Sequence, residues 1–309
     1  MRSRLVILVA IAIAAAAVFA VSHLVSSSSG PTSLPSTPAS YLGVYETGPP
    51  GTYQPVADLT KAAGRQPNLV GYYSGWGEPF QTSFAETVSQ HGAVTILQWD
   101  PSLVSVSVIA TGGYDRYLRS FADSVRNFGH PVVIGFGHEM NAPWYSWGYG
   151  QVPASMFVAA WRHIVRLFRD QGADDVTWLW TLQADEKGTG PIGSWWPGAQ
   201  YVTWVGIDGY YYRPSDTFFS IFGMTIAQVR AFTTKPVLLS ETAVGPGAGQ
   251  SAKIVNLFDG MYQYDTLGLV WFDIGQDNGI YHQDWHIEDS LAAQRTFRHA
   301  ASALALAHP

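Results

Sequence analysis

Eight short apolar segments, most of them separated by stretches with helical periodicity, constrain the fold of this chain more than any other feature. They are rich in β-branched and aromatic residues, as buried strands are. The strands are predicted at residues 41–45, 69–73, 94–99, 131–137, 176–181, 202–207, 236–240 and 269–272. Strands that alternate with helices pair in parallel, because each helix returns the chain to the same edge of the sheet. Eight such strands in 309 residues predict an α/β fold, a (β/α)8 TIM barrel, which needs roughly 250 residues.

Apolar residues spaced three and four apart predict helices between these strands. The predicted helices cover residues 55–63, 84–91, 114–128 and 157–168, parts of 218–232 and 251–264, and 287–306. Residues 182–200 are aromatic and glycine-rich, and the helical pattern fails there. The alternative architecture is an open doubly wound sheet, but no glycine-rich phosphate loop follows the first strand to support it.

The N-terminus has the pattern of an export signal. Arg2 and Arg4 precede an uninterrupted apolar run over residues 5–21. The run is close to the ~20 residues that cross a bilayer, so residues 1–25 are predicted to be a signal peptide or an uncleaved membrane anchor. Residues 26–40 are rich in Ser, Pro and Thr and are predicted to be a linker to a single catalytic domain at 41–309. We therefore expect a protein that is secreted or anchored outside the cytoplasm.

Composition excludes several function classes. The formal net charge is −6 and no basic cluster follows the first few residues, so nucleic acid is disfavoured as a partner. The chain has no cysteine, which excludes disulfides, thiolate metal sites and a cysteine nucleophile. A metal-dependent hydrolase on the same barrel is a further alternative, but no HxH or HExxH spacing supports a metal site. We expect a monomer without cofactor or metal.

Polar side chains recur where the predicted strands end, which is the active-site face of a (β/α)8 barrel. They are Asp100, His138, Glu139, Asn141, Asp185, Glu186, Asp208, Tyr210, Glu241 and Asp273. Any one of them could be a structural hydrogen-bond partner. Two glutamates placed directly at strand ends are harder to explain in this way, because burying an unpaired carboxylate is costly.

Glu139 and Glu241 follow the fourth and seventh strands, which lie across the mouth of such a barrel from each other. Paired carboxylates with aromatic neighbours suggest cleavage of a glycosidic bond: one acid protonates the leaving oxygen and the other attacks the anomeric carbon. Burial and neighbouring charges can separate the pKa values of the two acids as this division of roles requires.

Four segments, HEMNAPWYSWG, VGIDGY, LLSETAVG and VWFDIG, together resemble glycoside hydrolase family 26 over about residues 41–285. The family consists mainly of β-mannanases, with β-1,3-1,4-glucanases and β-1,3-xylanases among its members. The resemblance implies that Glu139 is the general acid/base and Glu241 the nucleophile of a retaining enzyme.

The resemblance also implies supporting roles. His138 matches the histidine before the acid/base, Asn141 a supporting asparagine of the same motif, and Tyr210 the tyrosine that hydrogen-bonds the nucleophile. Trp144 and Trp271 match aromatics that line sugar subsites. For Tyr145 and Trp147, loop packing and a role in the site remain equally open.

A linear β-linked polysaccharide is the expected partner. Trp144, Trp271 and Trp99 are expected to form aromatic walls around it, with its hydroxyls facing Asp100, Asn141 and Asp208.

Departures from the mannanase pattern bear on the substrate. Gly135-Phe136-Gly137 stands where mannanases often have an Arg-Pro-Leu-like segment, Ala142 where a glycine is common, and Gln98-Trp99-Asp100 where many have a Trp-His pair. We expect an exported retaining endo-β-glycanase acting on β-1,4-mannan, with β-1,3-1,4-glucan or β-1,3-xylan as alternatives. The alternative of another class is a non-catalytic polysaccharide-binding barrel, which would not require both glutamates.

Overall fold

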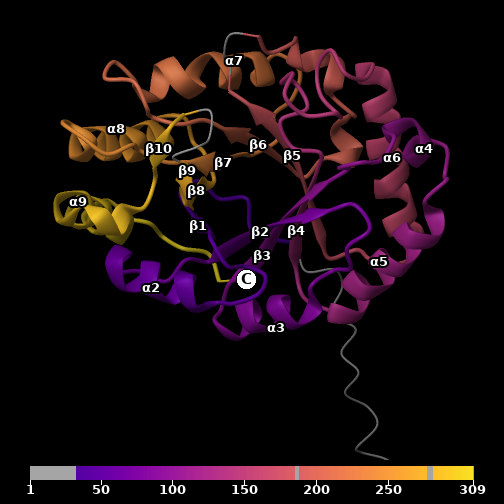
Figure 1. The fold of residues 1–309 in the computed structure, drawn as a ribbon, viewed down its shortest axis with the longest axis horizontal. Coiled ribbons are helices and arrows are strands. Elements are labelled where there is room, and N and C mark those ends of the chain that lie inside the picture. Colours follow the sequence, from indigo (N-terminus) through magenta and orange to yellow (C-terminus); the bar gives the residue numbers. More distant parts are fainter. Residues whose placement is uncertain (1–32, 185–187, 277–280, 309) are drawn as a thin grey trace, which may run out of the picture. The chain divides into compact units, whose positions relative to one another are not determined.

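A computed structural model of the chain describes residues 33–184, 188–276 and 281–308. Eight parallel strands follow one another in chain order around a closed barrel, and the last strand pairs with the first (Figure 1). The strands are β1 (Tyr41–Glu46), β2 (Leu69–Gly75), β3 (Val94–Asp100), β4 (Val132–Phe136), β5 (Val176–Gln183), β6 (Trp204–Asp208), β7 (Val237–Thr242) and β8 (Gly268–Asp273). The predicted (β/α)8 barrel is confirmed.

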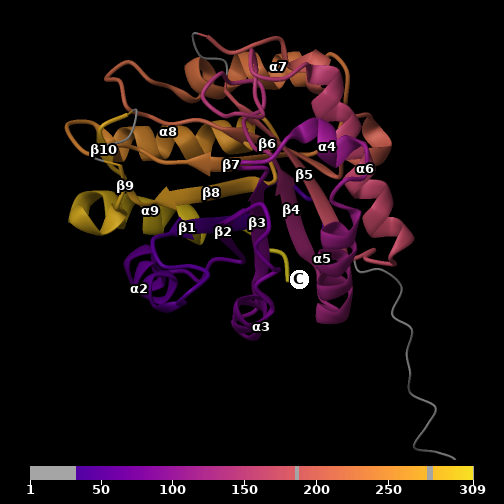
Figure 2. The ribbon, with the colours of Figure 1, turned by 45° about the vertical axis from the view of Figure 1, so that its right-hand side comes forward.

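Helices surround the barrel on its outside, as Figures 1 and 2 show. They are α2 (Gln54–Ala63), α3 (Thr82–Gln90), α4 (Val106–Ala110), α5 (Asp115–Phe128), α6 (Ala154–Asp170), α7 (Met224–Arg230), α8 (Gln250–Gln263) and α9 (Leu291–Ser302). Short 3₁₀ turns, η1 (Ile192–Trp195) and η2 (Ala199–Tyr201), stand between β5 and β6, where the helical pattern of the sequence fails. A short π-helix, η3 (Phe219–Gly223), leads into α7. A small hairpin of β9 (Gly275–Gln276) and β10 (Gln283–Asp284) and the 3₁₀ turn η4 (Ile287–Asp289) follow β8.

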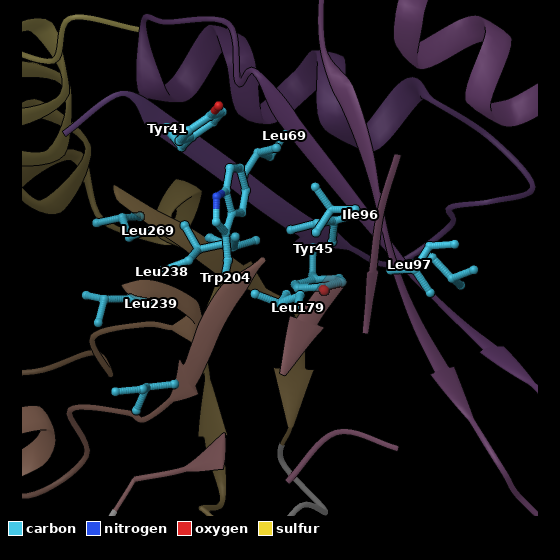
Figure 3. Close-up of a cluster of buried hydrophobic side chains, with 14 of the residues drawn as sticks. Tyr41, Tyr45, Leu69, Ile96, Leu97, Leu179, Trp204, Leu238, Leu239 and Leu269 are labelled. Carbon is cyan, nitrogen blue, oxygen red and sulfur yellow. The ribbon is translucent and has the colours of Figure 1, made fainter. Parts of the chain in front are cut away.

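Large side chains close the end of the barrel at which the strands begin. Tyr41 starts β1 and Trp204 starts β6, and their rings lie 4.9 Å apart. Figure 3 shows them among buried leucines from other strands, including Leu69, Leu238 and Leu269. This packed end leaves the opposite end, where the strands finish, for polar side chains.

The strand register is regular on one side of the barrel and irregular next to the predicted nucleophile. β2 and β3 pair without interruption from Leu69–Val94 to Gly75–Asp100. Between β6 and β7 the register shifts after Gly206, so that Asp208 pairs with Glu241. The pairing of β7 with β8 contains a second shift in register. Such irregularities re-aim side chains, and they are common at barrel rims and active sites.

The N-terminal boundary differs from the predicted linker. The compact unit begins at Ser33, and Leu34, Ala39 and Ser40 are buried against the barrel. Tyr41 donates its hydroxyl proton to the carbonyl oxygen of Pro35 (2.7 Å). Residues 34–40 therefore belong to the folded unit, because the apolar side chains of Leu34 and Ala39 pack against the core. The predicted signal or anchor at 1–25 lies outside the described residues, and no described helix is long and apolar enough to cross a membrane.

Candidate active site

The ends of β3, β4, β6 and β7 bring the predicted acids together. One carboxylate oxygen from each of Glu139, Asp208 and Glu241 lies within 4.8 Å of the other two. All three residues are buried, and His138 is buried beside them. The two glutamates that the sequence singled out thus share one small site at the mouth of the barrel.

Glu139 is aimed by an unusual backbone turn. β4 ends at Phe136, yet the Glu139 N–H still donates to the carbonyl oxygen of Thr181 in β5 (3.0 Å). Glu139 has φ of +52°, a left-handed conformation that is uncommon for any residue but glycine and costs roughly 1–3 kcal/mol. Gly137 has φ of +56°, and no larger residue fits at this position, because a Cβ there would lie 2.9 Å from the ring of Phe157.

The surroundings of Glu139 raise its pKa into the range that suits a general acid. Its Oε2 accepts a hydrogen bond from Trp144 Nε1 (2.7 Å). Burial raises the pKa of Glu139 to about 7; the positive charge on His138 opposes this rise and the negative charge on Glu241 adds to it. A carboxyl group with such a pKa can hold a proton near neutral pH and deliver it to a substrate.

Glu241 is gripped by two tyrosine hydroxyls. Tyr73 donates to Oε1 (2.5 Å) and Tyr210 donates to Oε2 (2.6 Å). Burial raises the pKa of Glu241, whereas the charge on His138 and the two hydroxyl hydrogen bonds lower it. Both oxygens are therefore positioned, and the bonds favour the ionised form.

His138 supplies the positive charge between these acids. Its Nδ1 is 2.8 Å from Asp100 Oδ1, and its Nε2 is 3.0 Å from the Tyr145 hydroxyl. Burial lowers the pKa of His138, but Asp100, Glu241 and Glu139 outweigh burial and raise it to about 9. The ring is thus an imidazolium at neutral pH, donating from both nitrogens.

Asp208 and Asn141, which were expected to face sugar hydroxyls, are buried and hydrogen-bonded to protein groups. Asp208 has no exposed surface and accepts a hydrogen bond from Ser240 Oγ (2.6 Å). Burial, with the charges of Glu241 and Glu139, raises the pKa of Asp208 well above its usual value, which favours the neutral form of this acid. The Asn141 side chain hydrogen-bonds the backbone of Gln183 twice, donating to its oxygen and accepting from its nitrogen (both 2.9 Å). Asn141 therefore ties the β4 loop to β5.

Two predicted aromatic walls are wrong, because their side chains point outward from the barrel. Trp99 is 0% exposed and stacks on Phe121 of α5 with ring centroids 4.2 Å apart. Trp271 is also 0% exposed, lies edge-on to Phe297 of α9, and donates to Asp273 Oδ1 (2.9 Å). Neighbouring residues of a strand face opposite sides, so the position of a tryptophan at a strand end does not place it in the mouth.

Trp144, by contrast, is 39% exposed beside Glu139. Trp147 is buried, donates to the His138 carbonyl oxygen (2.9 Å) and stacks on Tyr145, so its role is to pack the loop. Tyr145 also contacts the His138 ring and therefore belongs to the site. Asp185 and Glu186 lie outside the described residues.

Similarity to known proteins agrees with this arrangement. The model of the Glycosyl hydrolase family 26 matches residues 93–303, more than half of the chain. The chain belongs to glycosyl hydrolase family 26.

Relatives of this family 26 chain carry different names. Endoglucanase H of Acetivibrio thermocellus is 27% identical over 266 residues, which cover 80% of this chain and 29% of that protein. A mannan endo-1,4-beta-mannosidase of Bacillus subtilis is 28% identical over 188 residues, covering 54% of this chain and 49% of that protein. The chain thus spans less than half the length of either relative. The crystal structure of the YdhT protein from Bacillus subtilis has a TM-score of 0.65 at 17% identity over 84% of this chain and 85% of that one, which shows a shared fold.

Tyr73 is the residue of this family 26 site that sequence reasoning missed. It lies near the end of β2 next to Tyr72, and nothing local separates the two tyrosines. Tyr72 faces the helices, with its ring edge-on to Phe84, whereas Tyr73 faces inward to Glu241. The alternation of strand side chains was the available signal, but it needs the register of the barrel to say which tyrosine points inward.

The structure predicts that Asp100 keeps His138 charged. In Asp100→Asn, the burial of His138 loses its main electrostatic compensation, so the His138 pKa should fall from about 9 to ~6.5 or below. Nitrogen-15 NMR of the imidazole during a pH titration measures this directly. Asp58→Asn, an exposed change on α2, is the matched control and should leave the titration unchanged. A His138 pKa that stays near 9 in Asp100→Asn would contradict the assignment.

Proposed function

We propose that this chain is a retaining endo-β-glycanase that hydrolyses a linear β-linked polysaccharide. The observation that carries the proposal is the close approach of Glu139 and Glu241 in contrasting environments. Their nearest oxygens lie within 4.8 Å. This supports the roughly 5–5.5 Å carboxyl separation of retaining enzymes over the wider gap that an inverting enzyme needs for water.

In the first step, Glu139 gives its proton to the glycosidic oxygen while Glu241 attacks the anomeric carbon. The carbon–oxygen bond to the leaving sugar breaks, and an ester to Glu241 forms. Tyr73 and Tyr210 hold the attacking carboxylate, and the charge of His138 favours its ionised form.

In the second step, Glu139 acts as a base. The negative charge on Glu241 is one of the causes that raise the pKa of Glu139. Once Glu241 is a neutral ester, that contribution disappears and Glu139 more readily stays ionised. It can then take a proton from water as the water oxygen attacks the anomeric carbon, which releases Glu241 and restores Glu139 as an acid.

The surroundings of the pair suit a sugar chain. Trp144 is fixed by its bond to Glu139 and leaves part of its indole exposed, and pyranose rings bury their C–H faces on such surfaces. Tyr210, which donates to Glu241, also lines a pocket together with Tyr212, Arg213 and Asp216, among others. An exposed ring beside Glu139 and a pocket that shares Tyr210 with Glu241 support more than one sugar subsite around the pair.

The proposal predicts that the two glutamates fail differently when replaced. Glu241→Ala should abolish turnover of every glycoside, because no ester can form. Glu139→Ala should retain far more activity on an aryl glycoside with a good leaving group than on a polysaccharide, and azide should raise its rate by forming a β-glycosyl azide. Steady-state kinetics and product analysis measure both effects.

Glu86→Gln, an exposed change on α3, is the control and should keep the wild-type rate. Equal losses in both glutamate variants on all leaving groups, without azide rescue, would show that the roles are misassigned. A wild-type chain that binds polysaccharides but releases no sugar would favour the non-catalytic barrel.

As substrate we favour a β-glucan with mixed 1,3 and 1,4 linkages over β-1,4-mannan. The relative named endoglucanase matches 80% of the chain, whereas the relative named mannan endo-1,4-beta-mannosidase matches 54%. The departures at Gln98-Trp99-Asp100 and Gly135 also point away from mannan.

A reducing-sugar assay over mixed-linkage glucan, galactomannan and β-1,3-xylan decides the substrate, with the highest kcat/KM expected on the mixed-linkage glucan. A kcat/KM at least tenfold higher on galactomannan would restore mannan as the substrate.

Export also belongs to the proposal, because a polysaccharide substrate does not enter the cell. It rests on Arg2, Arg4 and the apolar run at residues 5–21. Fractionation of cells that express the full chain should place the glycanase activity in the medium or the membrane fraction. Activity confined to the cytoplasm would contradict it.

A further inference from the structure

Three carboxylates meet at the seam where the barrel closes. Glu46 ends β1, Asp273 ends β8, and Glu288 lies in η4 just before α9. The register pairs Glu46 directly with Asp273, and one oxygen from each of the three acids lies within 4.8 Å of the other two. Figure 1 shows β1 beside β8 on the side of the barrel that α9 covers. The cluster contains neither proposed catalytic glutamate.

The cluster has little positive charge around it. Among the residues that the structure describes, no Lys or Arg forms an ion pair with Glu46, Asp273 or Glu288. His286 lies in the same segment, but its Nδ1 is hydrogen-bonded to Asp284 (2.6 Å). Like charges on directly paired strand residues repel, and burying them without a counter-charge is expensive.

Asp273 shows where a ligand would bind. The residue is fully buried, and its Oδ1 accepts hydrogen bonds from Trp271 Nε1 and from the Ile287 N–H (both 2.9 Å). Its Oδ2 is equally inaccessible to solvent, and among the described residues no N–H or hydroxyl group donates to it; only the carboxyl groups of Glu46 and Glu288 lie near enough to Asp273 for a hydrogen bond. Glu288 Oε2 is in the same situation. Two buried oxygens that receive no hydrogen bond from outside their own group of acids are what a cation would satisfy.

We propose that Glu46, Asp273 and Glu288 bind a calcium ion. Calcium takes six to eight oxygen ligands in flexible geometry, and three carboxylates can supply up to six of them. Zinc would be expected to take histidine or cysteine ligands, and magnesium demands a stricter octahedron and keeps more of its water.

The ion would join three parts of the chain that are distant in sequence: β1, β8 and η4. It would close the barrel at the seam and fix the segment that carries Trp285, whose ring lies 5.0 Å from that of Tyr210. Tyr210 in turn donates to Glu241, so the ion would support the nucleophile through this packing without touching a substrate.

Terbium, a luminescent substitute for calcium, tests the site on the full chain without any assay of activity. Trp271 is hydrogen-bonded to Asp273 and should sensitise terbium bound there, and added calcium should displace the terbium signal. Glu288→Gln should weaken binding at least tenfold, whereas Glu86→Gln on α3 should leave it unchanged. The absence of saturable emission, or equal affinity in Glu288→Gln and the wild type, would overturn the proposal.

Thermal unfolding gives an independent readout. Calcium at about 100 times its Kd should raise the wild-type Tm by about 5 °C relative to a chelator, and this response should vanish in Glu288→Gln. If Glu288→Gln does not fold, Glu46→Gln serves in both experiments. Equal Tm values in calcium and chelator, with a more stable Glu288→Gln, would show instead a repulsive cluster that shares protons.

Discussion

The imidazolium of His138 is the interaction on which the rest of the site depends. Two glutamates buried a few ångströms apart could not both ionise, and burial raises the pKa of each. The charge on His138 opposes that rise in both cases. Burial would in turn neutralise His138, were it not for Asp100 at 2.8 Å. Four side chains from the ends of β3, β4 and β7 are thus coupled through charge, and the site works only if the barrel holds them together.

The backbone meets this requirement through local departures from a regular barrel. The left-handed conformations of Gly137 and Glu139 direct the side chain of the proposed acid/base into the mouth after β4 has ended. The register shift between β6 and β7 places Asp208 opposite Glu241. Asn141 makes two hydrogen bonds to the backbone of Gln183 in β5 and so holds the loop after Glu139. Strained or irregular backbone persists where the surrounding structure supports it, and here the closed sheet and its helices do so.

The sequence predicted the architecture well, because strand and helix periodicities are local signals and parallel pairing follows from their alternation. It also indicated Glu139, Glu241, His138 and Tyr210, which lie together in the structure. It failed where the direction of a side chain decides its role. Trp99 and Trp271 stand at strand ends but face the helices, and Tyr73 faces the nucleophile although its neighbour Tyr72 does not. A shift of one residue reverses the face, and only the three-dimensional register fixes it. The sequence also did not indicate that Leu34 is buried in the core, because the surrounding segment has the composition of a linker.

The retaining mechanism requires Glu241 to act as a nucleophile that forms an ester with the sugar. Proton NMR of the first product released from a β-linked oligosaccharide, recorded before mutarotation, tests this claim most directly. Two successive displacements at the anomeric carbon predict that the β-anomer appears first. Initial release of the α-anomer would mean a single displacement by water and would contradict the role assigned to Glu241.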